Sequence, residues 1–306
     1  ARAAGARIVA GADVRRIVAR AGAGPRRRHA VEARTADGPL VVRAPTVVVA
    51  AGAIHTPLLL ARSRLGGGSG QLGANLSLHP ATAAFALMDE VVDMARGVPQ
   101  SVYVDEFADE GILLEGVAGP PAYAAAALPL RGRRHAEAMA SYRRLAQMGL
   151  MVSDRSRGRV RAVAGRPLIR YDLDAADVAR FRAGLARLRA LLEAAGAREV
   201  YLPLPPGVAP EAARARDLRL MAFHPLGTAR AHADPRAGVV DGDLQLHGAP
   251  GIHVADGSVV PGPPGVNPQL TIMALATRLA FTLLGRPLPA PAPDDEEEEE
   301  ETACRS

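Results

Sequence analysis

The sequence has one cysteine, Cys304, and no tryptophan, and aromatic residues make up 3% of its 306 residues. A lone cysteine excludes an internal disulfide framework and any metal site built from several thiolates. Because few aromatic side chains are available to stack on bases, we interpret the scattered arginines as a solvated surface and expect no nucleic-acid partner. No apolar run approaches the roughly 20 residues that span a bilayer, and no signal-peptide core opens the chain. We therefore expect a cytoplasmic protein without a transmembrane segment, and peripheral contact with a membrane stays open.

The formal charge of +5 hides an uneven distribution. An uninterrupted acidic run occupies residues 294–301, so the body of the chain is more basic than the total indicates. Like charges in such a run repel one another and cannot form a core, so we predict a disordered acidic tail over residues 289–306. The chain opens on Ala1-Arg2 without a methionine, which is typical of a piece of a longer protein.

The N-terminal third predicts strands followed by a helix. Alternating apolar residues predict a strand-turn-strand over 7–20 and a hairpin joining 31–34 to 40–43. The β-branched run at 45–52 ends in Ala51-Gly52 and is typical of a strand buried on both faces. Thr56 and Pro57 then have the residue types of an N-cap and first position for a helix over 58–62. This order is that of a doubly wound dinucleotide-binding fold.

The middle of the chain predicts a mixed region. A single apolar stripe predicts a helix over 175–195, capped by Asp174 and stopped by Gly196. Two strands, 158–161 and 167–173, join at Gly165. A further helix is expected over 271–284. The GxGxxG match at 68–73 is rejected as a nucleotide fingerprint because it follows a helix and no helix opens behind it.

The change of character along the chain predicts an interrupted first domain. We expect an α/β fold of mixed α+β type. Residues 1–79 and 220–288 would form one incomplete domain, and residues 80–219 an inserted domain with an antiparallel sheet and helices.

The residue types alone favour neither a metal site, nor a serine hydrolase, nor a paired-carboxylate mechanism. The histidines at 224, 232, 247 and 253 have acids nearby, but no pair has helical HxxxH spacing, so no metal site is expected, and His247 and His253 are interpreted as surface turn residues. There is no GxSxG elbow for a hydrolase. No distinctive carboxylate pair is present.

What remains is an ordered set of motifs. His224 lies in HPLGT, followed by GVVD, then GIHVADGSVVP, then GVNPQLTIM at the entry to the last helix. Upstream stand VVVAAGAIHTPLLLARS and LGANLSLHP. In this order the chain resembles the glucose-methanol-choline (GMC) flavin oxidoreductases over nearly all of residues 1–286. It departs from their pattern at Arg64, where glycine is common, and at Ala229, where many members have cysteine.

The resemblance implies an FAD-dependent alcohol oxidoreductase. His224 would be the general base and Asn267 would bond the substrate oxygen, since imidazole titrates near neutrality and an amide only orients. The cofactor-binding positions that it implies are Val14, Ala51, Gly52, Asp256, Gly257, Asn267 and Pro268. His55 and His79 are expected to be supporting residues.

One alternative to this function stays open. The chain could be a truncated, non-catalytic GMC-fold remnant or interaction module that does not hold FAD, since the family's GxGxxG segment is not found in these 306 residues.

The segments VPQSVYVDEF and MVSDRSRGRV resemble relatives of the long-chain alcohol oxidases and favour a long, apolar alcohol as the substrate. The electron acceptor is not indicated.

Overall fold

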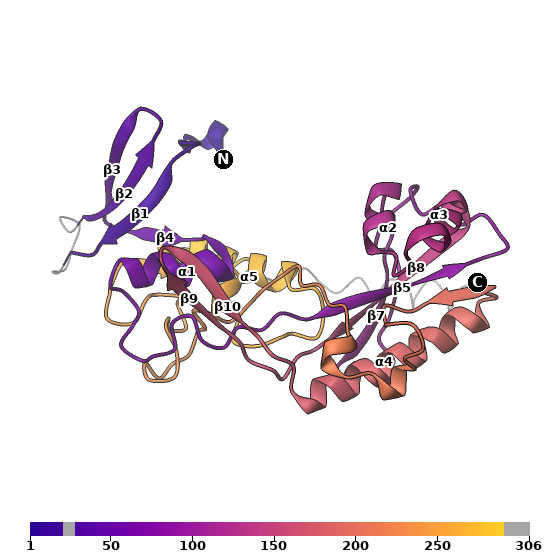
Figure 1. The fold of residues 1–306 in the computed structure, drawn as a ribbon. Coiled ribbons are helices and arrows are strands. Elements are labelled where there is room, and N and C mark those ends of the chain that lie inside the picture. Colours follow the sequence, from indigo (N-terminus) through magenta and orange to yellow (C-terminus); the bar gives the residue numbers. More distant parts are fainter. Residues whose placement is uncertain (21–27, 291–306) are drawn as a thin grey trace, which may run out of the picture.

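The computed structural model describes residues 1–20 and 28–290, and the predicted acidic tail lies almost wholly outside them. Figure 1 shows two lobes joined by long connections, with the three-stranded β1–β3 sheet at one end and helices α2 and α3 at the other. The α-helices of these described residues are α1 (Gly52–Arg62), α2 (Pro121–Ala127), α3 (Gly132–Ala140), α4 (Ala175–Ala194) and α5 (Gln269–Leu284). The mixed α/β class is the one predicted.

The N-terminal sheet contains β1 (Asp13–Val18), β2 (His29–Thr35) and β3 (Gly38–Ala44), all antiparallel. The predicted hairpin is confirmed, because β2 and β3 pair from His29 with Ala44 to Thr35 with Gly38. The prediction of two strands over 7–20 is wrong in its first half. Residues 6–10 are exposed and form no strand among the described residues, so alternation there had no neighbouring strand to pair with.

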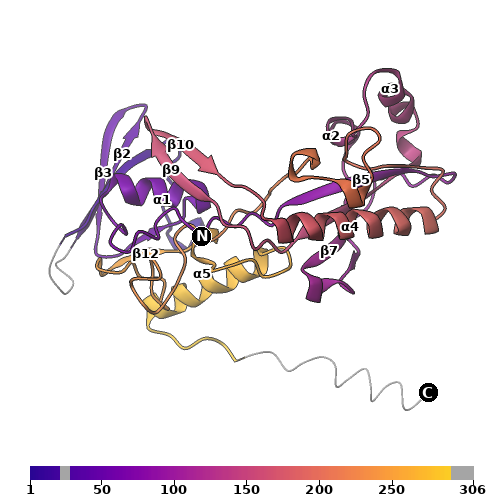
Figure 2. The same ribbon diagram turned by 60° about the horizontal axis from the view of Figure 1, so that its bottom comes forward.

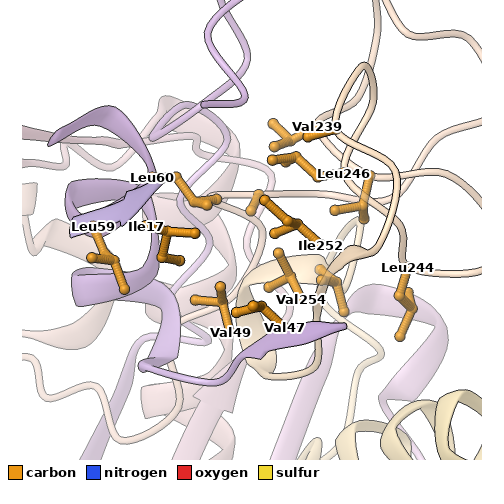
Figure 3. Packing of buried hydrophobic residues seen from close by; sticks show 14 of the residues in the cluster. Ile17, Val47, Val49, Leu59, Leu60, Val239, Leu244, Leu246, Ile252 and Val254 are labelled. Atoms are coloured by element: carbon orange, nitrogen blue, oxygen red, sulfur yellow. The ribbon is translucent and has the colours of Figure 1, made fainter. Parts of the chain in front are cut away.

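A two-stranded parallel pair, β4 (Val47–Val49) with β12 (Ile252–Val254), lies under α1. Val47, Val49 and Ile252 belong to the core that Figure 3 shows, together with side chains from α1 and the segment around residues 239–246. The prediction that this strand is buried on both faces is wrong, since Val48 is 45% exposed. Alternate side chains of a strand point to opposite faces, and only the face with Val47 and Val49 is covered in the described chain.

Helix α1 begins six residues before Leu58, where the predicted range of 58–62 starts. It starts at Gly52, whose φ of +79° suits glycine, and Pro57 lies inside it. Proline removes one helical hydrogen bond and leaves the carbonyl four residues before it without a donor. Here the Thr228 hydroxyl donates to the Ala53 carbonyl at 2.6 Å and replaces that bond. Thr56, predicted as the N-cap, instead donates to Asp256 at 2.6 Å.

This substitute bond predicts the effect of changing Thr228, which is fully buried. Thr228→Val keeps the shape but leaves the Ala53 carbonyl unsatisfied, so we expect the free energy of unfolding to fall by about 1–3 kcal/mol. Thr228→Ser keeps the hydroxyl and is the matched control. Urea unfolding of both variants measures the difference, and equal stability of the two would contradict this role.

The second lobe is built on a five-stranded antiparallel sheet in the order β11-β5-β8-β7-β6. Its strands are β5 (Ala81–Leu87), β6 (Tyr103–Val104), β7 (Ile112–Gly116), β8 (Leu145–Val152) and β11 (Glu199–Tyr201). Helix α4 packs its buried Phe181 and Leu185 on one face. Helices α2 and α3 cover the other through Ala124 and Ala138 (Figure 2).

The predicted helix over 175–195 is confirmed almost to the residue. Asp174 is the N-cap and accepts a hydrogen bond from the Asp177 backbone N–H at 2.7 Å. The predicted strand pair is β9 (Arg159–Val163) with β10 (Arg166–Arg170), turning at Gly165. Residues 66–73 form turns with no helix behind them, as expected from the rejected GxGxxG match.

The backbone of Gly73 approaches another strand closely. A Cβ on this residue would lie 2.2 Å from the Val160 carbonyl oxygen. Close backbone packing therefore accounts for this glycine.

The division of the chain into domains at residues 80 and 219 stays a prediction. Within the described residues, no helix has the length and apolar character required to cross a bilayer.

Candidate active site

The segment carrying His224 is held at both ends by backbone pairing. Met221 exchanges two hydrogen bonds with Ala81, at 2.8 and 2.9 Å. Leu226 does the same with Ser77, at 2.9 and 3.2 Å. The HPLGT turn is therefore fixed alongside residues 77–81, and His224 lies opposite His79. This explains why a histidine in a turn keeps a defined position.

Asn267 meets His224 from the entry to α5. The His224 Nε2 lies 3.0 Å from the Asn267 Oδ1. On its other side, the Asn267 Nδ2 donates to the Glu115 carboxylate at 2.9 Å. The two residues that the motifs single out are thus brought together from positions 43 residues apart. Glu115, on β7, is a third member that the sequence analysis missed. Only its place directly after three apolar residues of this strand could have marked it.

The pair lies at a cavity of about 710 Å³ between the two lobes. Its apolar lining includes Met151, Met221, Phe223, Ile272 and Met273. Its polar lining residues are Thr82, Gln100, Glu115, Tyr123, His224, Asn267 and Gln269. Pro268, another predicted position, also lines it. A largely apolar cavity with a few convergent polar groups is the usual form of a small-molecule site.

His79 supports the pair from the opposite side. It is buried and has a φ of +43°, an uncommon left-handed conformation for a non-glycine residue. Its Nε2 accepts a hydrogen bond from the Gly265 backbone N–H at 3.3 Å. Its ring meets that of His224 edge-on, with centroids 5.2 Å apart. Burial, aided by nearby His224 and opposed by Asp154, lowers the pKa of His79 from 6.5 to about 4. His79 is therefore neutral at physiological pH.

This lowered pKa predicts a pH-dependent stability. Between pH 6.5 and about 4 the unfolded chain binds a proton at His79 that the folded chain does not, so stability falls as the pH is lowered through this window. The full loss is on the order of 3 kcal/mol. We expect His79→Asn to reduce the difference in unfolding free energy between pH 7.5 and pH 4.5. An unchanged difference, measured by urea titration at both pH values, would exclude this proton linkage.

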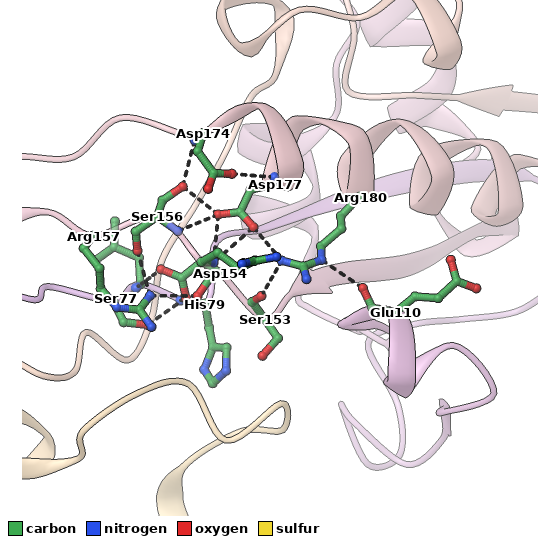
Figure 4. Close-up of polar contacts among 12 residues, drawn as sticks. Ser77, His79, Glu110, Ser153, Asp154, Ser156, Arg157, Asp174, Asp177 and Arg180 are labelled. Carbon is green, nitrogen blue, oxygen red and sulfur yellow. Dashed lines mark hydrogen bonds and ion pairs between the residues drawn. The ribbon is translucent and has the colours of Figure 1, made fainter.

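A buried hydrogen-bond network holds the backbone of His79 (Figure 4). The Asp154 carboxylate accepts from the Ser77 hydroxyl at 2.7 Å and from the His79 backbone N–H at 3.2 Å. The Tyr171 hydroxyl donates to it at 2.7 Å. Burial and the adjacent Asp154 carboxylate raise the pKa of Tyr171 above its ordinary value, so the phenol stays a donor. The network links segment 77–79 to Asp154, in the loop before β9, and to Tyr171, which follows β10.

Two further predicted positions line a second cavity. Val14 and Ala51 border a space of about 730 Å³ together with His55 and Arg62. The Arg62 guanidinium donates to the Val14 carbonyl at 2.9 Å. The β9–β10 turn borders the same space through Gly165. Val14 and Ala51, distant in sequence, are therefore brought to one site, separate from that of His224.

Gly52, Asp256 and Gly257 lie along the core of this lobe. The Asp256 carboxylate accepts from the Gly52 N–H at 2.9 Å, the Ser258 N–H at 2.8 Å and the Thr56 hydroxyl. Its side chain thus fixes the start of α1. Gly257 is buried, and a Cβ on it would lie 3.1 Å from the Pro225 carbonyl oxygen.

The remaining histidines do not converge on one site. His247 Nε2 contacts the His232 carbonyl at 3.0 Å. The interpretation of His253 as a surface turn residue is wrong, because it lies on β12 and is 7% exposed. On β12, unlike on β4, both faces are covered: Ile252, His253 and Val254 are all buried. Among residues 1–20 and 28–290, no group of three or more His, Cys, Asp and Glu side chains is arranged to hold a metal ion.

Comparison with known families gives a consistent result. Residues 1–81 and 154–276 match two family models, each described as GMC oxidoreductase. An uncharacterized GMC-type oxidoreductase of Mycobacterium tuberculosis is 44% identical over 291 residues, covering 91% of this chain and 45% of the relative. A long-chain-alcohol oxidase of Arabidopsis thaliana is 28% identical over 270 residues, covering 78% of this chain and 35% of the relative.

Solved structures share the fold. Pyridoxine 4-oxidase from Mesorbium loti superposes with a TM-score of 0.69 at 22% identity, covering 90% of this chain and 58% of that one. Formate oxidase superposes with a TM-score of 0.66 at 19% identity, covering 90% and 60%. The chain therefore spans less than half the length of the curated relatives named above and well over half of the solved ones.

Proposed function

The chain belongs to the GMC oxidoreductase family, and we propose that it oxidises an alcohol, with FAD as redox cofactor. In this proposal His224 takes the hydroxyl proton and Asn267 bonds the substrate oxygen. The observation that carries it is the 3.0 Å contact between His224 Nε2 and Asn267 Oδ1 at the edge of the apolar cavity. Imidazole is the side chain whose titration suits proton transfer near neutral pH.

The residues present fit a flavin dinucleotide in type. Val14 and Ala51 border one cavity, and Asn267 and Pro268 border the other. Arg62 offers a cation at the first. The Nδ1 atom of His224 is buried without a hydrogen-bond partner in the described chain and lies beside the His79 ring. When bound, FAD would supply the hydride acceptor, and this chain would supply position and proton transfer.

The proposed substrate is a primary alcohol with a sizeable apolar part. Methionine, isoleucine and phenylalanine side chains form much of the cavity lining, and flexible methionines adapt to varied apolar shapes. The similarity to a long-chain-alcohol oxidase supports the same substrate class.

Spectroscopy and turnover test the proposal together. The protein is purified, its visible flavin absorbance is recorded, and FAD is added where absorbance is absent. Anaerobic addition of short and long primary alcohols should then bleach the flavin, faster for the long ones. Hydrogen peroxide formed on admitting air would identify oxygen as the acceptor. A protein that stays colourless and cannot be reconstituted would favour the non-catalytic alternative.

A further inference from the structure

We propose that Glu115 is a positioning residue, whose carboxylate orients the Asn267 amide and thereby selects which ring nitrogen of His224 carries the hydrogen. This inference rests on the proposed roles of His224 and Asn267. Glu115 lies on β7, in the second lobe, whereas both of its targets belong to the segments that return to the first. The pair would thus be set by a residue from across the cavity.

The hydrogen-bonding capacity of each group gives the orientation. An ionised carboxylate only accepts hydrogen bonds, so the Asn267 atom facing Glu115 at 2.9 Å must be the Nδ2 donor. The amide oxygen then faces His224. An oxygen acceptor at 3.0 Å requires the His224 Nε2 to carry the hydrogen. His224 Nδ1 is therefore the nitrogen with the lone pair, and it lies buried beside His79.

Glu115 has no ion-pair partner in the described chain. Among the residues that line the cavity, Glu115 is the only Asp, Glu, Lys or Arg. None of the ion pairs found among residues 1–20 and 28–290 includes it. A carboxylate in apolar surroundings is costly unless it is hydrogen-bonded, and the Asn267 amide supplies that bond.

The stem of Glu115 is also held in place. Gly149 lies opposite it on β8, and a Cβ there would approach the Glu115 Cγ to 3.2 Å and a Val117 methyl carbon to 2.9 Å. The absence of a side chain at 149 leaves room for the Glu115 stem. Glycine at this position is explained by that close contact and not by an unusual backbone angle.

The orientation has a consequence for the substrate. One Nδ2 hydrogen is used by Glu115, which leaves the second for a substrate oxygen. Turning the amide would direct Oδ1 at the carboxylate, and two acceptors facing each other repel. When the substrate hydroxyl replaces Oδ1 as its partner, Nε2 can take the hydroxyl proton only after its own hydrogen has been released to solvent and Nδ1 has gained one, because a neutral imidazole carries a single hydrogen. Glu115 thus keeps the Asn267 Nδ2 donor directed at the substrate, while substrate binding changes which ring nitrogen of His224 carries the hydrogen.

Selective ¹⁵N labelling of histidine in the flavin-loaded protein tests this directly. The His224 signals are assigned by their loss in His224→Asn, and their shifts distinguish Nε2–H from Nδ1–H. We expect Nε2–H in the substrate-free protein. Glu115→Gln can donate or accept, so the amide is free to turn and a substantial Nδ1–H fraction should appear. Glu110→Gln, an exposed change outside the cavity, is the matched control and should leave the signals unchanged.

Steady-state kinetics give the second measurement. We expect Glu115→Gln to lower kcat about three- to tenfold while KM stays within about twofold, because the amide donor is correctly aimed in fewer molecules. Gly149→Ala should displace the Glu115 stem and produce the same shift of His224 signals with the carboxylate retained. An unchanged tautomer in both variants would overturn the proposal. The NMR measurement does not require that any alcohol is oxidised, so failure of the Glu115 proposal can be distinguished from failure of the proposed function.

Discussion

Replacing His224 with alanine is expected to lower the turnover of alcohol by roughly 10² to 10⁴, while flavin content and fold are retained. The reason is that no other described group adjacent to Asn267 in the cavity offers a neutral imidazole. His79 is nearby, but its Nε2 is used by Gly265 and it is buried behind His224. The rate of flavin bleaching under anaerobic conditions measures the effect on the chemical step without involving the electron acceptor.

The matched control is His232, eight positions along the same segment. Its Nδ1 accepts from the Asp234 backbone N–H at 3.0 Å, and it does not line the cavity. His232→Gln should retain near-normal bleaching. Equal losses in the two variants would point to a general effect on folding. Normal bleaching in His224→Ala would remove His224 from the proton transfer and leave Asn267 and Glu115 as the polar groups to examine.

The part of the site that could be predicted is the part encoded by ordered motifs. His224 and Asn267 stood in a recognisable order, and the turn and helix entry that carry them were evident from proline and glycine positions. The α4 stripe was equally readable, because Phe181, Leu185 and Leu188 recur at helical spacing and a capping aspartate precedes them.

What could not be predicted depends on contacts between distant segments. Helix α1 begins at Gly52 and not after Thr56 because Asp256, 204 residues away, binds the Gly52 N–H. The internal proline is tolerated because Thr228 supplies the missing donor. Glu115 follows three buried apolar residues of β7, and only the approach of Asn267 distinguishes it from a solvated acid. Local propensity carries no information on such partners.

Asp177→Ala is expected to reduce the free energy of unfolding by about 3–5 kcal/mol, the usual effect of removing one member of a buried charged network. The carboxylate is completely buried in the first turn of α4. It accepts from the Arg155 and Ser156 backbone N–H groups, at 2.9 and 2.8 Å, and binds the Arg180 guanidinium at 2.8 Å (Figure 4). Burial by itself raises the pKa of Asp177, but hydrogen bonds from Ser156, Arg155 and Arg180 outweigh it and lower the pKa overall.

The direction of that shift adds a pH signature to the same experiment. Since the folded pKa is below the unfolded value of 3.8, the contribution of Asp177 is present at neutral pH and is lost as the pH falls through the folded pKa. Urea unfolding at neutral pH should separate Asp177→Ala from wild type, and the separation should shrink in strong acid. Asp172→Asn, whose side chain is 77% exposed beside Arg170, is the control and should change stability by less than about 1 kcal/mol. If Asp177→Ala behaved like this control, the network would not be what holds α4 to residues 153–158.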